Sequence, residues 1–169
     1  MKRQLLVTGQ VLLALMFVAL ASTTVGSATI DNLREFQRGS WNEILRTHAG
    51  KPTIVHIWGV TCGPCRTEMP RWGAFLRERP DVGLVLIDAD LVPNESGAVA
   101  AMLDQAGLGG TESWTFGDGF VEPLRYEIDP QWRGEIPRTV LIGRDGATTI
   151  MEGVADFDEI RRWLDAQQR

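Results

Sequence analysis

Both cysteines of the chain, Cys62 and Cys65, lie close together, directly after a run of β-branched and aromatic residues. The run from Thr53 to Trp58 predicts a strand, and the residues after Cys65 follow a helical pattern, so the pair should lie where a strand gives way to a helix. Positions i and i+3 of an α-helix have Cα atoms roughly 5 Å apart, a separation at which two cysteines can form a disulfide. The pair is therefore suited to the reversible exchange of electrons.

The two sulfurs should differ in reactivity because only one of them lies at the start of the helix. Unpaired backbone N–H groups and a partial positive charge at that end favour the thiolate form of Cys62. We expect Cys62 to attack a disulfide, and Cys65, one turn further along, to resolve the mixed disulfide. A purely structural disulfide is a weak alternative, since a bridge across so short a segment constrains very little chain.

The N-terminal segment indicates export. At 169 residues with 44% hydrophobic residues, the chain is long enough for one domain with a single core. Early basic residues, an apolar segment and the small residues Ala19 and Ala21 match a secretory signal peptide over residues 1–21. We expect cleavage after Ala21, with the triplet Gly26-Ser27-Ala28 as a second choice, and an uncleaved membrane anchor is the alternative. Either way the folded domain should lie outside the cytoplasm, in a bacterial periplasm.

The net charge of −5 argues against nucleic acid as a partner. Two cysteines are too few for the usual four-ligand zinc sites, and Arg66 stands where a haem-attachment motif needs histidine. We therefore expect no bound metal and no cofactor. We also expect a monomer that contacts the membrane only through the N-terminal segment, if that segment is not cleaved.

The remaining pattern predicts an α/β domain with a mixed sheet. Residues 22–50 should form an N-terminal extension with a first helix, opened at Ser40 by a capping box with Glu43, and residues 51–169 the domain proper. Residues 82–88 are almost continuously apolar, as in a central strand covered on both faces. The other expected elements are a helix over 95–106, a strand over 113–116, a helical turn or two within 119–126, a hairpin of 138–142 and 147–151 around an Asp-Gly turn, and a final helix opened by Asp156 or Asp158.

This order of elements resembles the thioredoxin fold. The dipeptide Gly63-Pro64 between the cysteines is that of thioredoxin, and residues 135–142 are similar to the family's proline loop and the strand after it. The extra helix and strand between Asp88 and Pro137 resemble those that exported TlpA/ResA-type reductases add to thioredoxin. The expected fold class is thus an α/β thioredoxin fold, with helices on both faces of a mixed central sheet and a helix–strand insert as in TlpA/ResA-type proteins.

The resemblance implies a substrate site around the cysteines. The bond between Ile136 and Pro137 would be cis and lie against the cysteines, leaving Ile136 free to pair with an extended substrate chain; an ordinary turn is the alternative. Trp58, Gly63 and Pro64 would line the same substrate groove, unless Trp58 is simply a core aromatic residue.

Two titratable residues are candidates for handling the proton of Cys65. Glu68 lies one turn after Cys65 on the same helix face, and TlpA/ResA-type reductases carry a glutamate at this spacing; with a raised pKa it could hold or relay the proton. His56 stands where thioredoxin has a buried aspartate, and its imidazole could accept that proton near neutral pH. The alternatives are a solvated helix glutamate and a histidine that is merely hydrogen-bonded in the core. Thr61 departs from the tryptophan that most thioredoxin-like proteins place before the first cysteine.

Three functions fit these residues. The first is an exported enzyme, a thiol–disulfide oxidoreductase that reduces client disulfides and regains electrons from a membrane-embedded, thiol-reducing donor. The resemblance suggests clients in cytochrome c maturation or at the copper-site cysteines of a respiratory oxidase. The second is an oxidase or isomerase of secreted proteins, against which Gly63-Pro64 argues. The third is a non-enzymatic copper carrier that uses the two cysteines, with His56 or Met69 as a further ligand.

Overall fold

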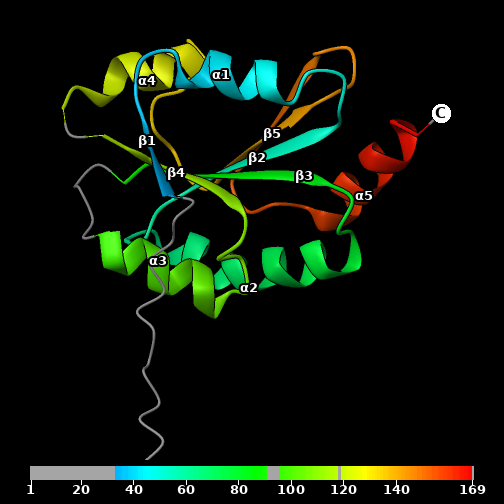
Figure 1. Ribbon diagram of the computed structural model, residues 1–169, viewed down its shortest axis with the longest axis horizontal. Coiled ribbons are helices and arrows are strands. Elements are labelled where there is room, and N and C mark those ends of the chain that lie inside the picture. The colour runs from blue at the N-terminus through cyan, green and yellow to red at the C-terminus, as the bar shows by residue number, and fades with distance from the viewer. Residues whose placement is uncertain (1–32, 91–95, 118, 169) are drawn as a thin grey trace, which may run out of the picture.

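A six-stranded mixed sheet with helices on both faces forms the protein (Figure 1). The computed structural model describes residues 33–90, 96–117 and 119–168, so the expected signal peptide at residues 1–21 lies outside the described residues. The strands are β1 (Leu33–Phe36), β2 (Thr53–Trp58), β3 (Gly83–Asp88), β4 (Glu112–Phe116), β5 (Arg138–Ile142) and β6 (Thr148–Glu152). The helices are α1 (Ser40–Thr47), α2 (Gly63–Glu78), α3 (Ser96–Gln105), α4 (Val121–Ile128) and α5 (Phe157–Ala166).

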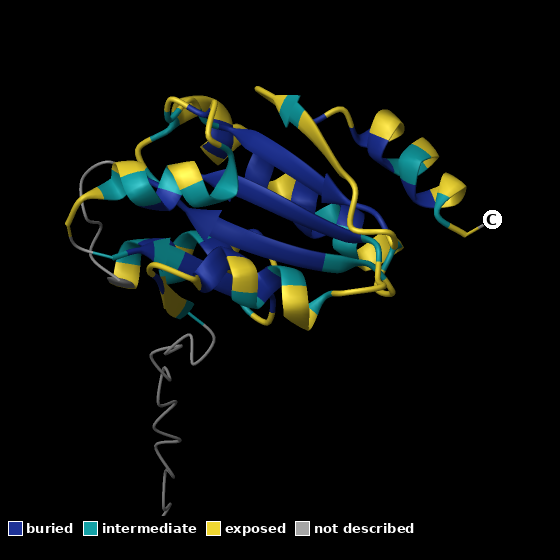
Figure 2. Ribbon diagram, turned by 90° about the horizontal axis from the view of Figure 1, so that it is seen from above, coloured by how far each residue is buried: buried dark blue, intermediate teal, exposed yellow. Residues whose placement is uncertain are grey.

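The sheet has the order β1-β4-β3-β2-β5-β6. β2 and β3 lie at its centre because both are almost continuously apolar, which suits strands covered on two faces. Every residue of β2 and all but the first of β3 are buried, and these strands form the dark blue centre of Figure 2. β3 pairs in parallel with β2 and β4, whereas β5 runs antiparallel to both β2 and β6. The predicted mixed sheet is confirmed.

Two hydrophobic cores lie on opposite faces of this sheet. Side chains alternate along β2, so Ile54 and Trp58 enter the core formed with α2, α3 and α5. Val55 and Ile57 enter the other core, formed with α1 and α4. Figure 1 shows these two layers, with α1 and α4 above the sheet and α2 and α3 below it. Cys65 belongs to the first core, and Cys62 packs against it.

The insert consists of α3 and β4. β4 lies between β1 and β3 and so occupies the interior of the sheet. α3 packs against α2, and the turn after α3 comes close to α2 at Gly73, where an added Cβ would lie only 1.8 Å from the Ala106 carbonyl oxygen. A glycine at this position is what allows the insert to sit against the cysteine helix.

The N-terminal end differs from the prediction in two ways. β1 was not predicted, because only Phe36 of its four residues is buried and no strand pattern marks it. The predicted capping box is wrong: α1 begins at Ser40 itself, after Gly39 at a φ of 87°. The Ser40 hydroxyl instead accepts a hydrogen bond from the Gln37 N–H, and the Glu43 carboxylate pairs with Arg34.

The other predicted elements are present within a few residues of their expected bounds. Asp156 opens α5 by accepting hydrogen bonds from two backbone N–H groups of its first turn. The hairpin of β5 and β6 turns at Gly146, which has a φ of 80°. Within the described ranges, no helix is long and apolar enough to cross a membrane.

Candidate redox-active site

Cys62 and Cys65 form a disulfide at the N-terminus of α2, with their Cα atoms 5.2 Å apart. β2 ends at Trp58, a short loop follows, and the helix begins at Gly63. Pro64 suits this first turn, because the backbone N–H that proline lacks would have no partner in the helix there. Cys62 is the N-cap residue, and its Sγ accepts a hydrogen bond from the Cys65 N–H at 3.2 Å. The predicted position at a strand-to-helix turn is confirmed.

The two cysteines differ in exposure. Cys62 is half-buried, whereas Cys65 is 0% exposed within the core of α2, α3 and α5. A partner disulfide can therefore reach only Cys62. Once the pair is reduced, the N–H groups of the first helical turn would stabilise a thiolate there.

The proline loop lies against the outer sulfur. The Ile136–Pro137 bond is cis, as predicted, and the Ile136 carbonyl oxygen lies 3.8 Å from Cys62 Sγ. Pro137 is buried and Ile136 is half-buried. The Trp132 indole N–H donates to the Glu135 carbonyl at 2.9 Å and so fixes the loop just before this bond.

Trp58 does not line an open groove. It shares a core with Cys65, but only 1% of it is exposed, because the central strand β2 directs it between the sheet and α2. Trp58 therefore matches the core alternative. Gly63 and Pro64, by contrast, are exposed beside Cys62 and remain available to a substrate.

Glu68 is a buried carboxyl group, not a solvated one. It is 1% exposed, and its Oε1 accepts hydrogen bonds from the Trp72 indole N–H at 3.0 Å and the Ala155 backbone N–H at 2.9 Å. Its Oε2 has no hydrogen-bond partner within the described residues. Burial raises the pKa of Glu68, while the bonds from Ala155 and Trp72 and the charge of Arg71 oppose the rise.

His56 is buried more completely still. It is 0% exposed, its Nδ1 lies 3.1 Å from Thr139 Oγ1, and its ring lies 4.7 Å from the ring of Trp72. Burial lowers the pKa of His56 from 6.5 to about 3. The expectation that His56 accepts a proton near neutral pH is therefore wrong, because the imidazole is neutral and only weakly basic in this setting. Trp72 lies against both His56 and Glu68.

Sequence reasoning missed Asp90, which holds the loop in front of Cys62. Its carboxylate accepts hydrogen bonds from the Thr61 N–H at 3.0 Å and the Thr61 hydroxyl at 2.5 Å. Asp90 reaches this loop because β2 and β3 run in parallel and end side by side, with Trp58 paired to Asp88. An acid soon after the neighbouring central strand was the signal that could have identified it.

Gly59 completes this anchor. A Cβ at this position would lie 2.4 Å from Asp90 Oδ1 and 2.9 Å from Ile136 Cδ1, so only glycine lets the loop pass between them. Thr61, which stands where a tryptophan was expected, thus has a defined structural role. In the part of the chain that the structure describes, no three His, Cys, Asp or Glu side chains form a group that could hold a metal ion.

The chain is similar to known proteins in part of its sequence and in its fold. No family model matches the chain. Over 53 residues the chain is 32% identical to the sporulation thiol-disulfide oxidoreductase A of Bacillus subtilis (strain 168). That stretch is 31% of this chain and 32% of the relative, so the match spans about a third of the relative's length.

Solved structures of similar shape identify the fold. DsbF of MTB superposes with a TM-score of 0.59 at 19% identity, over 72% of this chain and 84% of that one. A secreted Mycobacterium tuberculosis disulfide oxidoreductase homologous to E. coli DsbE gives 0.57 at 21% identity, over 72% and 85% of the two chains. StoA from Bacillus subtilis gives 0.53 at 22% identity, over 69% and 84%.

The chain thus has a thioredoxin-like α/β fold, with a Cys-x-x-Cys pair at the start of α2. Within that class, the structures that it resembles are proteins of the DsbE and StoA type. The expected fold class, including the helix–strand insert, is confirmed.

Proposed function

We propose that the protein is an exported thiol–disulfide oxidoreductase that reduces disulfides in client proteins. The observation that carries this proposal is the inequality of the cysteines: Cys62 is accessible at a helix N-terminus, and Cys65 is buried one turn behind it. An attacking sulfur has to be reachable, and a resolving sulfur has to be protected from other disulfides. Two of the similar proteins, a thiol-disulfide oxidoreductase and a disulfide oxidoreductase, support the same chemistry.

The reaction proceeds by two thiolate exchanges. The Cys62 thiolate attacks one sulfur of the client disulfide, which forms a mixed disulfide and releases a client thiolate that takes up a proton. Cys65 then loses its proton and attacks Cys62 Sγ, which releases the second client thiolate. The client gains two electrons and two protons, and the enzyme is left with the Cys62–Cys65 disulfide. A dithiol donor embedded in the membrane returns the enzyme to its reduced form by the same exchanges in reverse.

The residues around the pair assist these steps. The helix N-terminus and the Cys65 N–H stabilise the Cys62 thiolate, both as attacking and as leaving group. Glu68 takes the proton from Cys65, because burial makes its carboxylate a stronger proton acceptor than an exposed one. The Ile136 carbonyl beside Cys62 is placed to receive a backbone N–H from an extended client segment. His56 stays neutral and packs against Trp72.

The reducing direction is part of the proposal. The dipeptide Gly63-Pro64 supports it, and so does the need of an oxidising compartment for a dedicated reductant. Candidate clients are apocytochrome c and the copper-site cysteines of a respiratory oxidase, and the location is the periplasm, with the N-terminal segment either removed or kept as a tether.

The reduction potential of the Cys62–Cys65 pair tests the direction, and equilibration of the purified protein with glutathione or dithiothreitol buffers measures it. A value near about −270 mV, that of thioredoxin, supports a reductase, whereas a value near about −120 mV would assign the protein to the disulfide-forming catalysts. A Cys65→Ser variant tests the roles, since it should accumulate a mixed disulfide through Cys62. If a Cys62→Ser variant traps clients equally well, the assigned roles are reversed.

A further inference from the structure

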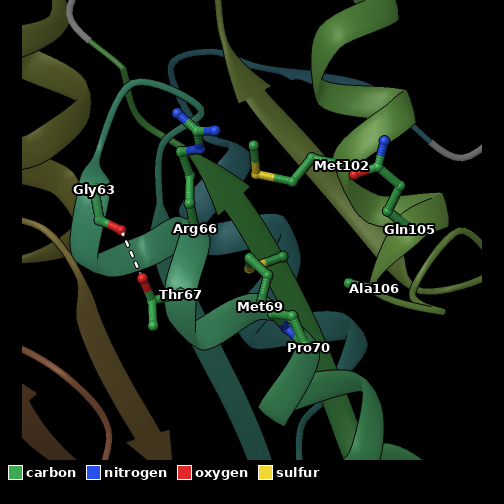
Figure 3. A pocket seen from close by; sticks show the side chains of 8 residues that line it. All are labelled: Gly63, Arg66, Thr67, Met69, Pro70, Met102, Gln105 and Ala106. Carbon is green, nitrogen blue, oxygen red and sulfur yellow. Dashed lines mark hydrogen bonds between the residues drawn. The ribbon is translucent and has the colours of Figure 1, made fainter.

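A groove lies between the cysteine helix α2 and the insert helix α3 (Figure 3). Its volume is about 570 Å³, which falls in the range of roughly 300–1,000 Å³ typical of ligand pockets. Residues of α2 form one side, and residues of α3 and the turn after it form the other. The lining residues are Gly63, Arg66, Thr67, Met69, Pro70, Met102, Gln105 and Ala106.

The groove opens beside the reactive sulfur. Gly63, at one end, directly follows Cys62, and its carbonyl accepts a hydrogen bond from the Thr67 hydroxyl at 3.3 Å, drawn as a dashed line in Figure 3. Gly63, Arg66 and Thr67 are all exposed. A polypeptide joined to Cys62 through a mixed disulfide would therefore have its neighbouring residues at the mouth of this groove.

The chemistry of the lining is mixed, with a single charge. Met102 is half-buried and offers an apolar surface, and methionine adapts to side chains of different shape. Met69 and Ala106 border the groove too, but both are buried. Gln105 offers an amide that can both donate and accept. Arg66 is the one charged residue of the lining, and it makes no ion pair within the described part of the chain.

Arg71 and Arg77 of the same helix also make no ion pair within the described residues, so the distinctive feature of Arg66 is its place in the groove lining. Two other arginines of this layer are paired. Arg79 pairs with Asp81 and Asp165, and Arg161 pairs with Glu78 and Asp158. In a chain with a net charge of −5, an exposed arginine without such a partner, at the edge of a partly apolar groove, is complementary to an acidic ligand.

We propose that this groove selects clients with an acidic residue close to the reactive cysteine. The carboxylate would bind the exposed Arg66 guanidinium, while an adjoining aliphatic stem packs against the half-buried Met102. This inference rests on the proposed function and deepens it, because it assigns client selection to the surface that the insert helix creates. Ion pairs at a partly exposed site have modest strength, so the expected preference is about fivefold in rate.

The test uses three peptides, each with one internal disulfide. They differ only at the position two residues from one of the cysteines, where the residue is Glu, Gln or Lys. The reduced full-length protein should reduce the Glu peptide about fivefold faster than the Lys peptide, measured as kcat/KM. Arg66→Glu should invert this ratio, and Arg66→Gln should bring it close to one. Arg46→Glu is the matched control, since it makes the same change of charge at an exposed residue of α1, on the opposite face of the sheet.

The uncharged disulfide of 2-mercaptoethanol separates the possible failures. If the wild-type protein reduces neither this compound nor any peptide, the proposed function itself fails. If the wild-type protein reduces all three peptides at one rate, the groove has no selective role and the oxidoreductase proposal stands. The same conclusion follows if Arg66→Glu lowers the rate for each peptide by the same factor as the rate for the neutral disulfide. Arg46→Glu inverting the ratio as well would show that net charge, and not the groove, controls the choice.

Discussion

The buried histidine predicts a steep loss of stability in mild acid. His56 has no exposed surface, and its pKa falls from 6.5 in an unfolded chain to about 3 in the folded protein. The unfolded state therefore gains a proton as the pH falls below 6.5, while the folded state does not until about pH 3. Titration of His56 therefore has little effect on the free energy of unfolding above pH 6.5 and lowers it progressively between pH 6.5 and 3.

The size of this effect follows from linkage. Each unit of pKa difference corresponds to about 1.4 kcal/mol, so the loss between pH 6.5 and pH 4 should be about 3 kcal/mol from His56 alone. That is a large part of the ~5–15 kcal/mol by which most domains are stable. The oxidised protein is the form to use, because its disulfide-bonded cysteines do not titrate.

Urea unfolding of the oxidised protein at several pH values measures this loss. His56→Asn removes the titrating group but keeps a polar side chain opposite Thr139. Between pH 6.5 and pH 4 the free energy of unfolding of this variant should therefore fall by about 3 kcal/mol less than that of the wild-type protein. His48→Asn is the matched control, since it removes the other histidine and retains the buried one. Equal acid slopes for wild type and His56→Asn would refute the reasoning, because they would mean that His56 titrates alike in both states.

Three further variants test the surroundings of the cysteines. Glu68→Gln should stabilise the oxidised protein above pH 4.5, because burial raises the pKa of Glu68 and its ionisation in the folded state costs stability. Urea unfolding measures this gain, which should vanish below pH 4.5. If Glu68 is the proton acceptor, the same change should slow the resolution of a mixed disulfide in the reduced protein by roughly 100-fold. Stopped-flow kinetics measure this rate, and an unchanged rate would exclude that role. Gly59→Ala should lower the free energy of unfolding in urea by about 1–3 kcal/mol, because its Cβ would collide with Asp90. Gly63→Ala is the control and should cost far less, since no atom lies within 4 Å of the new Cβ. Similar costs for the two variants would contradict this account of the loop. Thr61→Val, which removes one of the two hydrogen bonds to Asp90, should cost about 1 kcal/mol in the same assay, and a neutral result would mean that the bond from the Thr61 N–H holds the loop alone.

The sequence was sufficient for the cysteine pair and for the elements that position it. The apolar runs of β2 and β3, the helical pattern after Cys65 and the Gly63-Pro64 dipeptide are local signals, and each predicted what the structure contains. The proline loop was also predictable, because the motif around Pro137 is similar to that of a known family.

What the sequence did not provide depends on contacts between distant segments. β1 exists because β4 offers it a parallel edge, and nothing in its own four residues requires a strand. The role of Asp90 depends on two strands ending side by side, and the weak basicity of His56 depends on complete burial. A residue type predicts what chemistry is possible, whereas burial decides which protonation state the group holds.

The hydrogen bond from Ala155 to Glu68 has a consequence for how the protein acquires its activity. The two residues are 87 positions apart, and Ala155 precedes the last helix, α5. Because a chain is synthesised from its N-terminus, both cysteines are made before the segment that contains Ala155. During that interval the thiols are available for oxidation, but the Glu68 carboxyl group, one helical turn from Cys65, lacks a partner that it has in the finished fold. The surroundings of Glu68 are therefore complete only after the segment before α5 has been added.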